Sequence, residues 1–235
     1  MKLLVLDIEG TIFESVRLPG TSISSTVWQG IAKVLGPEVE KAEVQTHARW
    51  HSGKYAGYLD WMKATIELHR EFGLTQSNFF RVVNGARYRP GVKSGIDAAR
   101  NLGFEPVLVS GGFRELARRA QVDLGIVHAF AACEYFFDAS DRIVGYNLLP
   151  CDFAGKIDFI RLLLSEYRLG QSDWVFVGDG LNDAPIAKEA PYAIAISGHP
   201  QLQVVCDEKI ESFYELLPAL ERAARVLDVG RPALS

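Results

Sequence analysis

Short apolar runs that end in polar or glycine-rich turns recur along this chain. The first run covers residues 2–8 and is followed by Gly10. Similar runs lie at 106–109, before Ser110-Gly111-Gly112, at 174–177, before Gly178-Asp179-Gly180, and at 192–196, before Ser197-Gly198. Runs this short predict strands that are buried on both faces. Segments with helical spacing separate or follow them, at 92–102, 114–124, 157–167 and 210–226.

Strands that alternate with helices predict an α/β fold, with a Rossmann-like parallel sheet covered by helices on both faces. Right-handed crossovers are the default connection in such a sheet. Ligands of open parallel sheets bind at the carboxyl ends of the strands. Because each apolar run ends in a glycine-rich or aspartate-bearing turn, we expect these polar groups to converge at that edge.

Residues 15–86 follow a different pattern. They contain no strong β run, and helical spacing appears at 27–35, 39–50, 58–72 and 79–83. We predict that 15–86 form a small helical cap domain, inserted into a catalytic core made of residues 1–14 and 87–235. Residues 131–150 predict a β-hairpin that turns at 139–142.

Composition narrows the class of protein. The 235 residues are 48% hydrophobic and carry a net charge of −4, which suits a globular protein with a real core. Without a block of Lys and Arg, we expect neither a nucleic acid nor a membrane surface as a partner. The three cysteines fit no zinc pattern or disulfide framework, so a cytoplasmic location is expected. The N-terminal apolar run is too short for a signal peptide or a membrane span. The sequence does not indicate the oligomeric state.

Four short motifs occur in a fixed order: Asp7-Ile8-Glu9-Gly10-Thr11, Ser110-Gly111-Gly112, Lys156, and Gly-Asp-Gly-Leu-Asn-Asp at 178–183. Each alone is weak, since a Ser-Gly-Gly turn or a lone lysine is usually structural or solvated. In this order, they resemble the haloacid dehalogenase superfamily, and within it the phosphoserine-phosphatase-like branch. That branch has a helical cap between its first two motifs and a β-hairpin before its lysine. The resemblance covers roughly residues 2–220.

The chemistry of a phosphate monoester needs these residue types. Its oxygens are already negative, so catalysis consists mainly of positioning and charge neutralisation. Asp7 can act as a carboxylate nucleophile and form an aspartyl-phosphate. Glu9, two residues further along an extended chain, points the same way and can exchange protons with the leaving group and water. Asp7 and Asp179 supply the oxygen ligands that Mg²⁺ prefers.

The resemblance assigns roles to the remaining motif residues. The backbone carbonyl of Glu9 is expected to be a further Mg²⁺ ligand, with Asp183 in or near the coordination sphere. Lys156 is expected to neutralise the phosphate and the Asp7 carboxylate. The expected phosphate or substrate contacts are Thr11, the Ser110 hydroxyl, the Gly111 amide and Asn182.

Two departures from the family pattern matter. The usual second acid is aspartate, whereas this chain has Glu9, which is one methylene longer and which we interpret as a working acid and base. Enolase-phosphatases of the same superfamily share the Asp-x-Glu-Gly-Thr start but not the later motifs.

Phosphoserine phosphatases also carry an acidic residue about nine positions after the nucleophile and an arginine on a cap helix. Here these positions hold Val16 and Ala64, so phosphoserine is not predicted as the substrate. Other charged residues that could replace them are Glu14, Arg17, Arg49 and Lys63.

The predicted cap carries two further groups of candidate residues. His47 and His51 share a helical face, but no third ligand is in a recognisable place, so a surface or cap-lining role is favoured over zinc. An aromatic cluster either packs the cap or forms a wall over an apolar or ring-bearing substrate. Its members are Trp50, Tyr55, Tyr58 and Trp61.

The sequence therefore predicts a Mg²⁺-dependent phosphohydrolase that acts on a small phosphorylated metabolite through an aspartyl-phosphate. A phosphotransferase to an alcohol acceptor is the alternative, because water and an alcohol would use the same base. A non-catalytic binding protein on the same scaffold is disfavoured, since Asp7, Ser110, Lys156 and Asp179 are all present.

Overall fold

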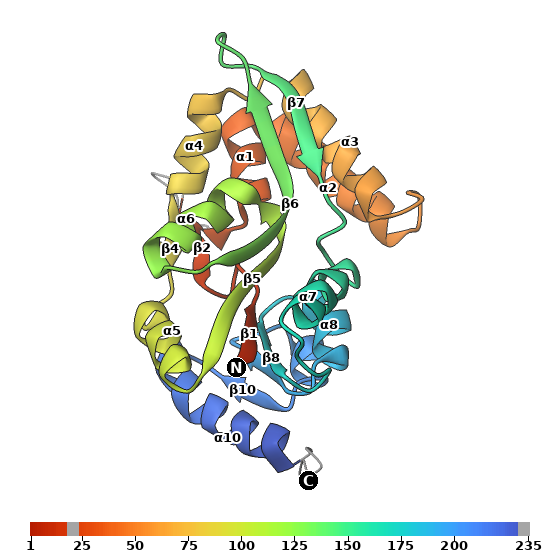
Figure 1. Ribbon diagram of the computed structural model, residues 1–235. Coiled ribbons are helices and arrows are strands. Elements are labelled where there is room, and N and C mark those ends of the chain that lie inside the picture. Colours follow the sequence, from red (N-terminus) through yellow and green to blue (C-terminus); the bar gives the residue numbers. More distant parts are fainter. Residues whose placement is uncertain (18–23, 230–235) are drawn as a thin grey trace.

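The computed structural model describes residues 1–17 and 24–229, with the backbone alone at 15–17, 24–25 and 229. A seven-stranded sheet forms the core (Figure 1). β7 pairs antiparallel with β6, and the other neighbours pair in parallel. The predicted α/β class is thereby confirmed. In spatial order the strands are β10 (Glu208–Ile210), β9 (Ala193–Ile196), β8 (Trp174–Gly178), β1 (Lys2–Leu6), β5 (Phe104–Phe113), β6 (His128–Phe137) and β7 (Ile143–Leu148).

Successive side chains of β1 enter opposite apolar layers. Leu4 and Leu6 pack into one cluster with α5 (Val92–Asn101), α6 (Arg114–Leu124) and α10 (Leu216–Val229). Leu3 and Val5 pack into the other with α7 (Gly155–Glu166), α8 (Ala184–Glu189) and α9 (Pro200–Gln203). Because the strand is buried on both faces, its sequence is a continuous apolar run. This is the Rossmann-like arrangement that the sequence predicts.

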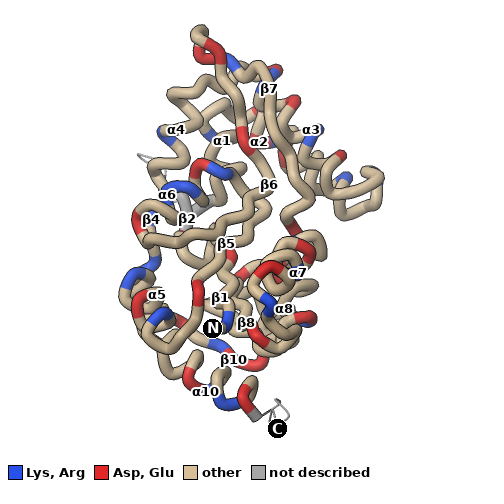
Figure 2. Tube along the Cα trace, viewed as in Figure 1, with Lys and Arg blue, Asp and Glu red and all other residues tan. Residues whose placement is uncertain are grey.

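Four helices follow the first strand, as the cap prediction requires. They are α1 (Val27–Leu35), α2 (Pro37–His51), α3 (Tyr58–Glu71) and α4 (Gln76–Asn84). A capping box starts α1, since the Thr26 hydroxyl accepts from the Gln29 amide and the Gln29 side chain accepts from the Thr26 amide. In Figure 1 these helices lie at the end of the molecule opposite the C-terminus. Charges of both signs are interspersed along the trace (Figure 2).

Although residues 15–86 contain no strong β run, the structure has short strands within this segment and across its ends. β2 (Phe13–Arg17), β3 (Ser24–Ser25) and β4 (Ala86–Tyr88) form a small antiparallel sheet where the helices join the core. The sequence of β2, Phe-Glu-Ser-Val-Arg, has no apolar run. Pairing with distant residues defines this strand, for example Val16 with Ala86. This sheet extends across both limits of the predicted cap, whose boundaries remain a prediction.

The hairpin prediction is confirmed by β6 and β7. At its turn, one oxygen of Asp138 accepts hydrogen bonds from the amides of Ser140 and Arg142. However, β6 starts earlier than expected, and its first half pairs in parallel with β5, where His128 lies opposite Val107. The segment His-Ala-Phe-Ala-Ala is rich in alanine, which is depleted in strands, and was therefore not predicted as part of the sheet.

The helix expected at 210–226 begins later than predicted. Ile210 ends the edge strand β10, and a short 3₁₀ turn, η2 (Phe213–Glu215), precedes α10. The Ser212 hydroxyl accepts from the Tyr214 amide and so caps this turn. A local side-chain hydrogen bond therefore separates strand and helix within one apolar stretch. Among the described residues, no helix has the length and apolarity that a bilayer span needs.

The helices after β2 share an apolar cluster with the core sheet. Val27 and Ile31 of α1 and Phe79 of α4 belong to the same cluster as Leu4 and Leu6. The Phe79 ring lies 5.1 Å from that of Phe113 and 5.4 Å from that of Tyr135, measured between centroids. The turn before α4 also meets the tip of the hairpin, where Thr75 and Arg142 form a β-bridge. One side of the predicted cap is thus packed directly on the core.

His69 of α3 is a buried group within this interface. It has 0% exposure, and its Nδ1 lies 2.8 Å from the hydroxyl of Tyr135 on β6. Its Nε2 has no hydrogen-bond partner among the described residues. Burial lowers the pKa of His69 from 6.5 to about 3. The imidazole is therefore neutral in the folded protein.

We predict that His69 makes the protein less stable in acid. As the pH falls from 6.5 towards about 3, the unfolded chain binds a proton at this residue and the folded chain does not. The free energy of unfolding should lose about 1.4 kcal/mol per pH unit from this group. His69→Phe should remove that component of the slope, measured by urea denaturation at several pH values. His199→Asn, at an exposed position, is the control. Equal slopes in wild type and His69→Phe would contradict the prediction.

Candidate active site

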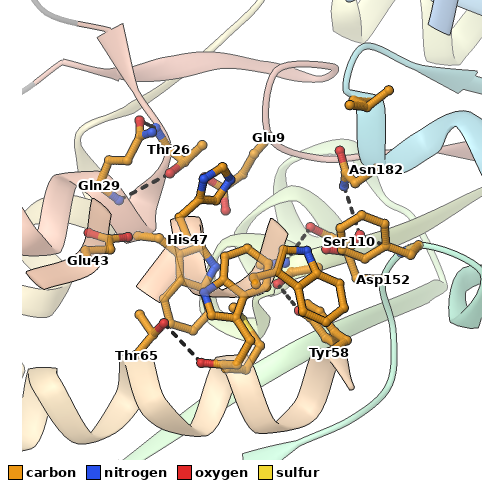
Figure 3. A pocket seen from close by; sticks show the side chains of 18 of the residues that line it. Glu9, Thr26, Gln29, Glu43, His47, Tyr58, Thr65, Ser110, Asp152 and Asn182 are labelled. Carbon is orange, nitrogen blue, oxygen red and sulfur yellow. Dashed lines mark hydrogen bonds between the residues drawn. The ribbon is translucent and has the colours of Figure 1, made fainter. Parts of the chain in front are cut away.

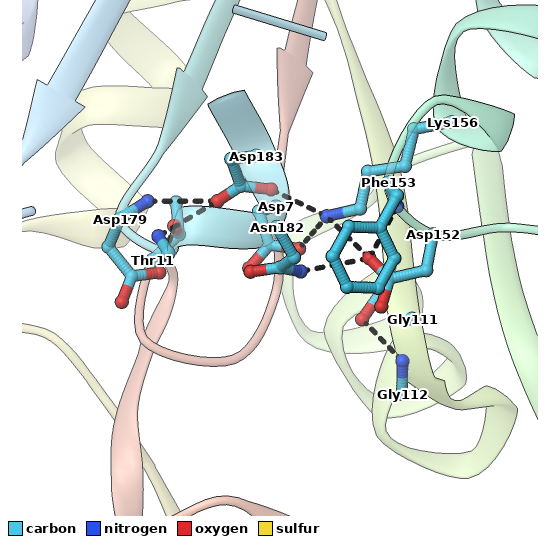
Figure 4. A network of polar contacts seen from close by, with 12 residues as sticks. Asp7, Thr11, Gly111, Gly112, Asp152, Phe153, Lys156, Asp179, Asn182 and Asp183 are labelled. Atoms are coloured by element: carbon cyan, nitrogen blue, oxygen red, sulfur yellow. Dashed lines mark hydrogen bonds and ion pairs between the residues drawn. The ribbon is translucent and has the colours of Figure 1, made fainter. Parts of the chain in front are cut away.

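The motif residues converge at the carboxyl end of the sheet (Figure 4). Asp7 directly follows β1, Ser110 lies near the end of β5, and Asp179 directly follows β8. β1 lies between β5 and β8, so the three turns meet at one edge. The structure thus brings together groups that are far apart in the sequence, as expected for a parallel sheet.

Lys156, in the first turn of α7, is the cation at the centre of this group. Its side chain is fully buried, and its Nζ lies 2.6 Å from Asp7 Oδ1 and 2.7 Å from Asp183 Oδ1. Asp152 Oδ1 lies further away, at 3.9 Å. Burial alone would lower the pKa of Lys156, but these carboxylates, Asp183 first, outweigh it and raise that pKa above its usual value. Lys156 is therefore a charged ammonium.

Asp183 fixes the loop after β8. Its Oδ2 accepts hydrogen bonds from the backbone amides of Asp179, at 3.1 Å, and Gly180, at 3.0 Å. Its Oδ1 accepts from Lys156. The carboxylate is fully buried and ends the short 3₁₀ turn η1 (Leu181–Asp183). Each of its oxygens therefore has a charged or amide partner, which compensates for its loss of water.

Three carboxylates in this group suit an oxygen-binding metal ion. Asp7, Asp179 and Asp183 each offer an oxygen, and these atoms lie within 4.8 Å of one another. Burial, with Asp183 and Asp179 adding to it, raises the pKa of Asp7, although Lys156 lowers it. Burial and then Asp183 raise the pKa of Asp179 to about 7. Three carboxylates thus face one ammonium, and a divalent cation would relieve their repulsion.

The turn after Asp7 supports Asp179. The Thr11 hydroxyl donates to Asp179 Oδ1 at 2.9 Å. Thr11 is fully buried and does not line the cavity described below, so it orients Asp179, whereas the sequence predicted a phosphate contact. Gly10 has φ +85°, and a Cβ there would collide with the Asp179 carboxylate. Arg89 holds the turn by donating to the Gly10 carbonyl at 2.8 and 2.6 Å.

The Ser-Gly-Gly segment forms a tight loop at the end of β5. Ser110 Oγ accepts from the Gly112 amide at 3.0 Å. The Gly111 carbonyl accepts from the hydroxyl of Tyr58, on α3, at 3.1 Å. A Cβ at Gly111 would collide with the carboxylate of Asp152, so this close approach requires glycine. The loop is therefore in contact with Tyr58 of α3 on one side and with Asp152 on the other.

Asp152 is the main site residue that the sequence reasoning missed. Its Oδ1 accepts from Asn182 Nδ2 at 2.8 Å and from the Phe153 amide at 2.9 Å. Asn182, predicted to contact phosphate or substrate, lines the cavity but donates to Asp152. Asp152 belongs to no motif. The available signal was its position four residues before Lys156, in the turn that leads into α7.

Glu9 lies between the cap helices and the Ser-Gly-Gly loop. Its Oε2 accepts from the amide of Val27, the first residue of α1, at 2.6 Å. The N-terminus of a helix favours such a carboxyl group. Its other oxygen lies against Gly112, where a Cβ would collide with it. Burial raises the pKa of Glu9 to about 7. Glu9 and Asp7 line the same cavity, as the sequence predicts.

That cavity has a volume of about 420 Å³ and lies between core and cap residues (Figure 3). From the core it is lined by Asp7, Glu9, Ser110, Gly111, Gly112, Asp152, Phe153, Leu181 and Asn182. From the predicted cap, the lining residues are Thr26, Trp28, Gln29, Glu43, His47, Trp50, His51, Tyr58, Trp61, Met62 and Thr65.

Most of the predicted aromatic wall faces the cavity. Trp50, Tyr58 and Trp61 line it, whereas Tyr55 does not. His47 and His51 also line it, with their Nε2 atoms 3.1 Å apart, so the cap-lining role is confirmed. Three of the four charged residues considered as substitutes for the missing family residues are not at the cavity. Glu14, Arg49 and Lys63 do not line it, and the side chains of Val16 and Arg17 lie outside the described residues.

Comparison with known proteins identifies the family. A family model described as haloacid dehalogenase-like hydrolase matches residues 1–191. The phosphoserine phosphatase of Streptococcus thermophilus is 27% identical over 236 residues, which cover 97% of this chain and 97% of that protein. The probable phosphoserine phosphatase of Schizosaccharomyces pombe is 27% identical, over 67% of this chain but only 51% of that longer protein.

Solved structures agree in fold. A phosphoserine phosphatase with a phospho-aspartyl intermediate analogue superposes with a TM-score of 0.75 at 21% identity, covering 93% of this chain and 98% of that one. Phosphoserine phosphatase from T. onnurineus gives 0.66 at 23% identity, with 94% of each chain covered. The chain belongs to the haloacid dehalogenase-like hydrolases. Within that family it lies on the phosphoserine-phosphatase-like branch, which confirms the resemblance and makes it an enzyme of the phosphatase type.

We predict that Asp183→Asn destabilises the fold. The change removes a charge beside the fully buried Lys156 and turns an NH₂ group towards the ammonium or the backbone amides. The free energy of unfolding should fall by about 3 kcal/mol, measured by urea denaturation in a chelator so that metal binding does not contribute. Asp158→Asn makes the same change at an exposed position of α7, where Asp158 pairs with Arg161, and should cost less than about 0.5 kcal/mol. Equal losses would show that the buried ion pair does not stabilise the fold.

Proposed function

We propose that this protein hydrolyses a small phosphomonoester through an aspartyl-phosphate on Asp7, with Mg²⁺ as its metal ion. The observation that carries the proposal is the position of Asp7. It lines the cavity, Lys156 binds one of its oxygens at 2.6 Å, and it belongs to the carboxylate group that suits a metal ion. Its named relatives are phosphatases, so transfer to an alcohol acceptor is not favoured.

In the first step, the second carboxylate oxygen of Asp7 attacks phosphorus. A bond forms between this oxygen and phosphorus, and the bond from phosphorus to the ester oxygen breaks. Glu9 donates a proton to the departing alkoxide. In the second step, Glu9 takes a proton from water as the water attacks the aspartyl-phosphate, which releases phosphate and restores Asp7. One carboxylate thus forms the covalent bond and the other moves the proton.

The remaining site residues are proposed to bind the phosphate group or the metal ion. Ser110 and the Gly111 amide, which line the cavity, are proposed to bind the phosphate oxygens, and Lys156, held at Asp7, to neutralise the charge of the phosphate. The carboxylates of Asp7, Asp179 and Asp183 and the carbonyl of Glu9 would hold Mg²⁺. When bound, this ion neutralises charge on the phosphate and on the carboxylates around it.

Residues 15–86 are proposed to act as the cap that sets specificity. The phosphate contacts come from the core and are the same for every monoester, so discrimination depends on groups from α1, α2 and α3. Closure of such a cap excludes water and strengthens the charge interactions inside the site.

Hydrolysis of 4-nitrophenyl phosphate with Mg²⁺ tests the proposal. The wild-type protein should turn over this substrate and lose its activity in excess chelator. Asp7→Asn should have no measurable turnover, because an amide does not form the acyl phosphate. Full activity in the chelator would refute the metal, and undiminished turnover in Asp7→Asn would refute the nucleophile.

Glu9→Gln tests the proton transfer separately. An amide keeps the shape of the side chain but does not exchange protons, so both steps should slow by roughly 10²- to 10⁴-fold. Mg²⁺ binding should change little, because the carbonyl of Glu9 is the expected ligand. Stopped-flow and steady-state rates on 4-nitrophenyl phosphate measure the two steps. Glu14→Gln, an exposed glutamate nearby, is the matched control. Wild-type rates in Glu9→Gln would place the proton donor elsewhere.

A further inference from the structure

The charges that line the cavity are unbalanced. Four acidic residues line it, and no Lys or Arg is found among its lining residues in the described part of the chain. Three of these acids, Asp7, Glu9 and Asp152, lie at the phosphate end and have the hydrogen-bond partners described above. The fourth, Glu43, comes from α2 and lies outside that network.

Glu43 is a carboxylate without a counter-charge from the described residues. No hydrogen bond or ion pair joins its side chain to them, although it is only half exposed. Burial, followed by the neighbouring charge of Glu40, raises the pKa of Glu43 to about 7. An acid placed in this way gains most from a positively charged ligand, which offsets the loss of water around its charged form.

Aromatic side chains from the predicted cap line the same cavity. The rings of Trp50 and Trp61 stack with centroids 5.3 Å apart and planes 10° apart. The indole N–H of Trp61 donates to Thr46 Oγ1 at 3.3 Å, and Thr46 does not line the cavity, so Trp61 offers its ring to a ligand. Trp28 lines the cavity from α1. Tryptophan faces attract cations more strongly than other side-chain rings do.

His47 does not supply the missing positive charge. Burial, with His51 adding to it, lowers the pKa of His47. The two Nε2 atoms face each other at 3.1 Å, so one nitrogen must accept while the other donates. A substrate carboxylate near α2 would therefore meet Glu43 and a neutral His47, and none of the described lining residues is a lysine or arginine that could pair with it.

We propose that the organic part of the substrate carries an ammonium group, bound between Glu43 and the Trp50–Trp61 pair, and no carboxylate. The substrate class is then the phosphate monoesters of amino alcohols. This inference rests on the proposed phosphohydrolase activity and adds the chemistry of the group that the cap recognises. It also separates this chain from relatives that are named phosphoserine phosphatases.

Three substrates separate the effect of a substrate ammonium group from that of a substrate carboxylate. O-phosphoethanolamine carries the ammonium alone, O-phosphoserine adds a carboxylate, and ethyl phosphate has neither. For the wild-type protein with Mg²⁺, kcat/KM should be at least tenfold higher for O-phosphoethanolamine than for either of the others. In Glu43→Gln, the ratio of kcat/KM between O-phosphoethanolamine and ethyl phosphate should fall by tenfold or more. Glu71→Gln, an exposed glutamate on α3 that does not line the cavity, should leave this ratio unchanged.

The outcomes distinguish the two proposals. If wild-type protein does not hydrolyse 4-nitrophenyl phosphate, the phosphohydrolase proposal itself fails. If it does, but O-phosphoserine or ethyl phosphate is used as well as O-phosphoethanolamine, the ammonium site is overturned and the phosphatase remains. An unchanged ratio in Glu43→Gln also overturns it. The comparison in wild-type protein needs no variant, so it decides the point even if Glu43→Gln fails to fold.

Discussion

The site depends on one fully buried ammonium. Lys156 joins three parts of the chain, because its Nζ binds Asp7 after β1 and Asp183 after β8 while its backbone lies in the first turn of α7. Such a charge is tolerated only where carboxylates compensate for its lost hydration. Those carboxylates are the groups that also suit a metal ion, so the interaction that allows Lys156 to be buried brings the proposed nucleophile and metal ligands to one point. Asp183 also fixes the loop after β8, because its carboxylate accepts hydrogen bonds from the amides of Asp179 and Gly180.

Among the described residues, two hydrogen bonds join the helices of the predicted cap to the candidate active site. The first amide of α1 binds Glu9, and Tyr58 of α3 binds the Gly111 carbonyl. The proposed proton donor and the proposed phosphate loop are therefore both fixed from outside the sheet. A shift of α1 or α3 would change the position of groups that bind or protonate the substrate. In the proposed mechanism, the predicted cap is therefore linked directly to the groups that act on the substrate.

The sequence predicted the parts of the structure that local patterns determine. Strands buried on both faces are apolar runs, and the turns after them carry Asp7, Ser110 and Asp179, so the sheet and the motif residues could be predicted. β2 could not, because its pairing with β4 is a long-range contact with no apolar run of its own. Asp152 and Glu43 were missed because their roles come from what surrounds them in space. Thr11 was placed in the right region, but its partner, Asp179, is a residue far along the chain.

The helices of the cap differ in what they contribute to the core. α1, α3 and α4 place Val27, Ile66 and Phe79 in the apolar cluster of the sheet, whereas α2 places no residue there. Only Val39 and Thr46 of α2 are buried. Yet this helix carries Glu43, His47 and Trp50, three of the residues that line the cavity. Exchanges at these positions leave the core untouched, so the preference for a substrate can diverge between related proteins while the fold and the phosphate chemistry are conserved.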